Sequence, residues 1–91
     1  MDFVKVGDQQ KCSMYKLDVG WQKSIELCAE ICNGVTTAFI YGTNERGGRG
    51  CGVGRASTTK GPCQCECESR AGKLVDCDTV KDRNFNMYKY I

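Results

Sequence analysis

Eight cysteines are the residues of this 91-residue chain whose type and spacing could do chemistry. Cys63, Cys65 and Cys67 occupy alternate positions in the stretch GPCQCECESRAGKLVDC (residues 61–77), which ends at Cys77. Thiolates at this density can bind zinc, and each cysteine can instead be one half of a disulfide. The two states belong to different compartments, because disulfides persist mainly outside the cytosol.

The spacing of the cysteines argues against zinc. Structural zinc sites usually combine two C-x2–4-C pairs, often with histidine. This chain has no histidine and no C-x-x-C; Cys63, Cys65 and Cys67 form C-x-C-x-C, and Cys28 and Cys32 form C-x3-C. Metallothionein-like clusters use C-x-C spacing, yet their chains lack aromatic residues, whereas this chain has Trp21, four Tyr and three Phe. A metal site and reduced structural thiols stay open as alternatives. The even count favours disulfides and no metal, with these cysteines oxidised: Cys12, Cys28, Cys32, Cys51, Cys63, Cys65, Cys67 and Cys77.

The composition supports the same interpretation. Leu, Ile, Val and Phe together make up only 17 of the 91 residues, which is a small supply for a self-sufficient core. Disulfides are the usual compensation in small secreted domains, so we expect one secreted or extracellular domain over residues 1–91, with 1–11 as an N-terminal extension. The opening MDFVKVGDQQ is not a signal peptide, and both a mature chain and an excised domain would explain this. A net charge of +2 and no long apolar run predict neither nucleic-acid binding nor membrane insertion.

One helix and several short strands are predicted. In GWQKSIELCAEICNG (residues 20–34), Ser24 is a suitable N-cap, Asn33-Gly34 supplies a left-handed stop, and Leu27, Cys28, Ile31 and Cys32 share one stripe. Because Cys28 and Cys32 lie one turn apart with parallel side chains, we expect them to bond separate partners among Cys51, Cys63, Cys65 and Cys67. Cys12 with Cys77 is the expected terminal crosslink. Aromatic and β-branched residues predict strands at 12–17, 36–42, 73–77 and 85–91.

The glycine-rich segment 42–62 has the one local charge asymmetry of the chain. It carries seven glycines and four cations against a single acid, Glu45, and it has no phosphate-binding motif. It is either a solvated hairpin loop or a ligand-facing loop. For the second case we expect aromatic and polar groups to be exposed beside the cations, and the candidate ligand-binding residues are Tyr41, Thr43, Asn44, Glu45, Arg46, Arg49, Arg55 and Lys60.

The order of these elements resembles that of PAN/apple domains. The similarity rests on a cysteine in an N-terminal strand, a helix with CAEIC, the strand TTAFIYG, the following CGV and the closing NFNMYKY, and it spans residues 12–91. The CQCEC stretch is similar to PAN-like modules of invertebrate extracellular proteins. Thr36 and Thr37 stand where many members have a cysteine, so one of Cys63, Cys65 and Cys67 must replace the usual partner. The resemblance implies an α+β fold with one helix on a curved antiparallel sheet of about five strands, and chain ends on neighbouring strands.

The resemblance also implies a recognition module rather than an enzyme, with a glycan or an extracellular protein as its partner and no cofactor. The residues agree, because a chain without histidine has no Ser-His or Cys-His couple and disulfide-bonded cysteines are not nucleophiles. Three functions stay open: glycan binding, which is favoured, a protein-interaction or adhesion module that could be homo-oligomeric, and a small toxin or inhibitor. Trp21 is a core residue or a sugar platform, of which the core is favoured, and Tyr15, Tyr88 and Tyr90 are expected to pack in strands.

Overall fold

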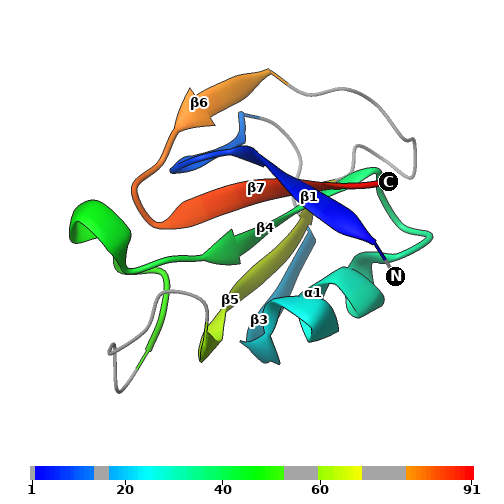
Figure 1. The fold of residues 1–91 in the computed structure, drawn as a ribbon, viewed down its shortest axis with the longest axis horizontal. Coiled ribbons are helices and arrows are strands. Elements are labelled where there is room, and N and C mark those ends of the chain that lie inside the picture. The colour runs from blue at the N-terminus through cyan, green and yellow to red at the C-terminus, as the bar shows by residue number, and fades with distance from the viewer. Residues whose placement is uncertain (1, 14–16, 53–59, 69–77) are drawn as a thin grey trace.

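A computed structural model describes residues 2–13, 17–52, 60–68 and 78–91 and shows a helix packed against a five-stranded antiparallel sheet (Figure 1). Across this sheet the strands follow the order β1 (Phe3–Gly7), β7 (Phe85–Tyr90), β4 (Ala38–Gly42), β5 (Lys60–Glu68) and β3 (Leu17–Ser24). A separate two-stranded ribbon pairs β2 (Gln10–Cys12) with β6 (Thr79–Lys81). The predicted small disulfide-rich α+β fold is therefore confirmed.

The helix α1 (Ile25–Cys32) begins and ends where the sequence predicts. Ser24 is extended, and its hydroxyl accepts a hydrogen bond from the Leu27 amide at 3.1 Å, which satisfies one of the free N–H groups of the first turn. After the helix, Gly34 adopts a φ of +80°, a left-handed conformation that glycine accepts at little cost. Two helix cysteines, Cys28 and Cys32, are fully buried against the sheet.

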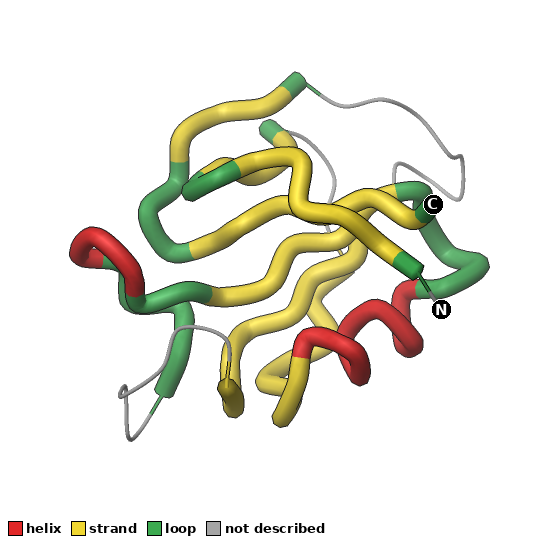
Figure 2. The backbone as a smooth tube through the Cα atoms, in the orientation of Figure 1, coloured by secondary structure: helices red, strands yellow, loops and turns green. Residues whose placement is uncertain are grey.

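The two faces of the sheet are covered by different elements, because side chains alternate along each strand. On one face, Phe39, Tyr41 and Tyr88 pack with the cysteines of β5 beneath α1. On the other face, Ile40, Phe85 and Met87 form a second, smaller core with Cys12 of β2. Figure 2 shows α1 and the β2–β6 ribbon on opposite sides of the sheet. This arrangement leaves the short η1 turn (Glu45–Gly47) projecting at one end, away from α1.

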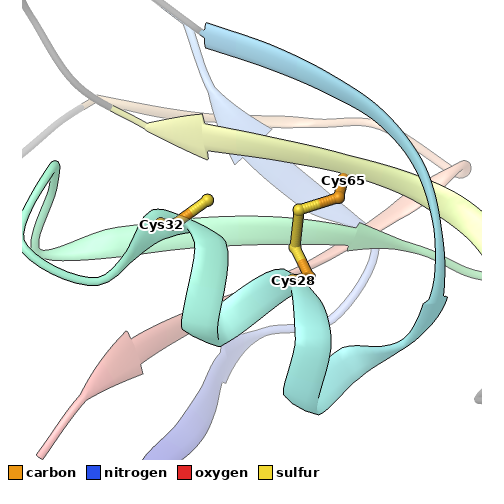
Figure 3. Close-up of side chains that lie close together, drawn as sticks. All are labelled: Cys28, Cys32 and Cys65. Carbon is orange, nitrogen blue, oxygen red and sulfur yellow. A yellow bond between two sulfur atoms is a disulfide. The ribbon is translucent and has the colours of Figure 1, made fainter.

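Disulfides join the helix to the central strand β5. Cys28 bonds Cys65 and Cys32 bonds Cys67, so the two helix cysteines have separate partners as predicted. Figure 3 shows the Cys28–Cys65 bridge, with the Cys32 sulfur one helical turn away. A third bridge, Cys51–Cys63, links directly opposed residues in an isolated antiparallel pair.

Cys12 is also disulfide-bonded, while the expected partner Cys77 lies outside the described residues.

Several expected elements differ in the structure. The predicted strand at 12–17 is wrong, because Cys12 ends β2 and Leu17 begins β3, on a different sheet. Residues 20–24, which lead up to and include the predicted N-cap Ser24, belong to β3. Residues 1–11, treated as an extension, contribute β1 and most of β2, and Phe3 pairs with Tyr90, so the two chain ends lie on neighbouring strands. The expected strand at 73–77 and the expected packing of Tyr15 fall outside the described residues.

In the described ranges, no helix has the length and apolar character that a membrane span requires.

Candidate functional site

The predicted loop site is only partly assembled in the structure. Tyr41 and Thr43 were expected to be exposed, but they are 1% and 0% exposed, so the expected exposure is wrong. Tyr41 lies opposite Cys65 on the helix-side face of β4, and its hydroxyl donates to the Gln22 carbonyl at 2.9 Å. Burial raises the pKa of Tyr41 above its ordinary value, so its hydroxyl stays a neutral donor.

Thr43 and Asn44 shape the loop instead of facing solvent. The Thr43 hydroxyl accepts from the Glu45 amide at 3.1 Å, and its backbone carbonyl accepts from Gly50 at 3.0 Å. Asn44 is half-buried, and its side-chain oxygen accepts from the Cys51 amide at 3.1 Å. These polar residues therefore satisfy the backbone of the turn, which a loop without regular pairing must do through side chains.

Asn84, in the turn before β7, ties the loop to the end of the sheet. Its carbonyl accepts from the Thr43 amide and its side-chain oxygen from the Arg49 amide, both at 2.8 Å. Gly50 makes this approach possible, because a Cβ there would lie only 1.9 Å from the Asn84 carbonyl oxygen. These contacts hold segment 43–51 against the turn at Asn84, and the Cys51–Cys63 bridge ties the same segment to β5.

Three exposed arginines lie on the braced loop and on the neighbouring turn before β7. We call Arg46, Arg49 and Arg83 the arginine cluster. Arg46 belongs to η1 and Arg49 follows it, while Arg83 precedes Asn84 and places its Nη1 atom 4.0 Å from where a Cβ on Gly47 would lie. Gln9 braces both segments, since its amide donates to the carbonyls of Glu45 (2.8 Å) and Arg83 (3.2 Å).

The three arginines of the cluster differ in the ion pairs that they make. Arg46 makes an ion pair with Asp8 at 2.5 Å and a longer one with Glu45 at 3.8 Å, and its hydrogen bond holds the pKa of Asp8 below the ordinary value. Over the described part of the chain, by contrast, Arg49 and Arg83 have no ion-pair partner. The cluster thus contains two guanidinium groups, of Arg49 and Arg83, that form no ion pair with any carboxylate in the described part of the chain.

The backbone of Arg46 is itself unusual. Its φ of 46° and ψ of 45° lie in the left-handed region, which costs a residue with a Cβ roughly 1–2 kcal/mol. Such strain persists only where neighbouring contacts over-determine the conformation. Here the Asp8 ion pair and the bonds of Gln9 hold the turn that carries Arg46.

Of the eight predicted ligand residues, Arg46 and Arg49 are exposed on the same loop, and Glu45 is half-buried and paired with Arg46. Arg55 and the side chain of Lys60 lie outside the described part of the chain. Arg83 was missed, because only the pairing of β4 with β7, in which Gly42 opposes Phe85, brings the turn before β7 to the loop. Sequence spacing alone carries no signal of that pairing.

Three cysteine sulfurs among the described residues also lie close enough together to resemble a metal site. The sulfur atoms of Cys28, Cys32 and Cys65 all lie within 4.8 Å of one another and are fully buried (Figure 3). Each is committed to a disulfide, and a disulfide sulfur is not the thiolate that zinc requires. In this oxidised form the group serves to crosslink the core.

Comparisons with protein-family models, with curated proteins and with solved structures find no match to this chain. The resemblance to PAN/apple domains therefore stays a prediction, and the function has to be argued from the site itself.

Proposed function

We propose that the chain is an extracellular recognition module that binds anionic glycans through the arginine cluster. The observation that carries the proposal is the pair of exposed guanidinium groups, Arg49 and Arg83, without an ion-pair partner among the described residues. Guanidinium groups can hold sulfate and carboxylate groups by two parallel hydrogen bonds each. The several disulfides are typical of extracellular proteins, where such glycans occur.

The rigidity of the loop supports the same function. Asn84, Gln9 and the Cys51–Cys63 bridge fix the backbone at both arginine segments. Binding then orders only the arginine side chains, so less conformational entropy is lost than with an unbraced loop. The buried residues Tyr41 and Thr43 take part as supports of the loop and not as ligand contacts.

A binding comparison tests the proposal. The parent, Arg49→Ala/Arg83→Ala and the charge-matched control Lys23→Ala/Lys89→Ala are titrated with a heparin-derived oligosaccharide and with its desulfated form. Two exposed charge-assisted contacts of about 0.7 kcal/mol each amount to roughly a tenfold loss of affinity for the arginine variant. We expect the control to keep most of its affinity, and the desulfated ligand to bind weakly to all three proteins.

The proposal fails if the parent binds the sulfated and the desulfated ligand equally. It also fails if the lysine control loses as much affinity as the arginine variant, because binding would then follow net charge and not the cluster.

A protein-interaction module is the second candidate, and one observation favours it. Leu27, Ile31 and Val35 recur every four residues along and just beyond α1, and each is 37% exposed. Leu27 and Ile31 lie four residues apart in α1 and so share one helix face, while Val35 follows the turn that ends the helix. Leu27 and Ile31 thus form an exposed apolar pair on the outer side of α1. Under this alternative, Ile31→Lys would abolish capture of a protein partner and leave glycan binding unchanged.

A further inference from the structure

Trp21, the only tryptophan of the chain, lies 48% exposed on the edge strand β3. The expectation that it is a core residue is therefore wrong. The reason is the strand register: Gln22 opposes Cys63, whose side chain is buried beneath α1, whereas Trp21 opposes Gln64 on the other face of the sheet. Directly opposed residues share a face, so the indole lies beside the Gln64 side chain.

The backbone around Trp21 is irregular on both sides. The β3–β5 register shifts between Asp18 and Trp21 and again between Gln22 and Ser24. In the first irregularity, Gly20 has a φ of +82° and its amide donates to the Asp18 carboxylate at 2.8 Å. Bulges of this kind re-aim side chains and are frequent beside binding sites. Here they present a large aromatic ring to solvent.

Gly52 keeps part of the indole uncovered. A Cβ on Gly52 would lie 3.5 Å from Cζ3 and 3.8 Å from Cε3 of the Trp21 ring, so a longer side chain there would extend over the indole. Gly52 is fixed by its amide, which donates to the Pro62 carbonyl at 3.0 Å. The absence of a side chain at this position thus leaves the aromatic surface accessible.

The polar groups around the ring indicate what it would bind. On β5, Glu66 lies two residues from Gln64, and Asp18 opposes Glu66 across the β3–β5 pair. The register therefore places two carboxylates and an amide on the sheet face that carries the indole. Carboxylates repel anions and accept hydrogen bonds from hydroxyl groups, and an amide can both donate and accept. An aromatic plane with such a border matches a ligand with an apolar C–H face and hydroxyl edges.

We propose that Trp21 is the stacking platform of a second binding site, which takes neutral pyranose sugars. The indole would contact the C–H face of the sugar, while Gln64 and the carboxylates of Asp18 and Glu66 would bind its hydroxyl groups. This site shares no residue with the arginine cluster and takes uncharged ligands, so it goes beyond the anionic-glycan function proposed above.

Tryptophan fluorescence tests the proposal directly, because all tryptophan emission comes from Trp21. The parent protein is titrated with methyl glucoside, methyl galactoside and methyl mannoside at low and at high salt. We expect a saturable change of emission with at least one of them, with a dissociation constant on the order of 1 mM. The affinity should not depend on salt, because no ion pair with the ligand is formed.

Two substitutions of Gly52 test whether the uncovered indole face is the part of the site that binds the sugar. Gly52→Leu places a side chain over the indole and should weaken binding at least tenfold, while the matched Gly52→Ala adds only a methyl group at ordinary contact distance and should bind within about threefold of the parent. Circular dichroism verifies that both variants fold. Trp21→Ala, measured by calorimetry, should bind none of the sugars.

The proposal is overturned if none of the three sugars produces a saturable change, or if folded Gly52→Leu binds as well as Gly52→Ala. Its failure is distinguishable from that of the anionic-glycan function, because Arg49→Ala/Arg83→Ala should keep the neutral-sugar response and Gly52→Leu should keep binding of the sulfated oligosaccharide.

Discussion

Removal of one helix-to-strand disulfide should destabilise the chain more than removal of the loop disulfide. Cys28 and Cys65 are separated by 37 residues, whereas Cys51 and Cys63 are separated by only 12. The chain-entropy relation gives losses of about 3.8 kcal/mol for the longer loop and about 2.8 kcal/mol for the shorter one at 25 °C. Both double substitutions to alanine remove two buried cysteines, so the loss of packing is similar and their difference reports mainly the loop length.

Equilibrium unfolding in guanidinium chloride, followed by circular dichroism, measures both losses. We expect Cys28→Ala/Cys65→Ala to lose roughly 1 kcal/mol more free energy of unfolding than Cys51→Ala/Cys63→Ala. In a domain of this size each kcal/mol corresponds to about 4–8 °C, so the melting temperatures should also separate. The reasoning is refuted if the loop variant is the less stable one, or if neither variant differs from the parent.

Three further substitutions probe single contacts. Tyr90→Phe removes the hydroxyl that donates to the Ala29 carbonyl of α1 at 2.5 Å and should cost about 1 kcal/mol in chemical unfolding. Burial raises the pKa of Tyr90 to about 12. The contribution of the neutral hydroxyl to the free energy of unfolding should therefore be complete below pH about 10 and lost as the pH rises toward 12. Tyrosinate absorbance and stability, measured together across this range, would show the loss. Arg46→Gly relieves a left-handed backbone and should leave the free energy of unfolding unchanged or higher by up to about 1 kcal/mol while weakening sulfated-glycan binding; a large destabilisation would contradict this. Ser24→Ala removes the acceptor for the Leu27 amide and should cost about 1 kcal/mol, whereas Ser24→Asp should retain most of the stability.

The features that sequence reasoning predicted correctly are local ones. Ser24 and Gly34 marked the limits of the helix, because capping depends on residues within one turn. The parallel direction of Cys28 and Cys32 on one helix face required two separate partners, and the alternation along β5 supplied them in Cys65 and Cys67.

The errors concern features that depend on strand order and register. Trp21 was assigned to the core because a tryptophan just before a helix usually covers the core, whereas pairing of β3 with β5 turns it to the face away from α1. Tyr41 lies in β4 and Thr43 directly follows this strand, and their burial depends on α1 covering one face and on the Asn84 turn packing against the loop. Arg83 joined the cluster through the same pairing of distant segments.

The central claim, recognition of anionic glycans by the arginine cluster, is tested most directly by nuclear magnetic resonance of the arginine side chains. A ¹⁵N-labelled sample is titrated with the heparin-derived oligosaccharide, and the Nε–H signals of all arginines are followed. The account predicts that the signals of Arg49 and Arg83 shift most, with Arg46 next because part of its charge is already paired with Asp8. Shifts confined to the other two arginines, Arg55 and Arg70, or no shifts at the cluster despite binding, would contradict it.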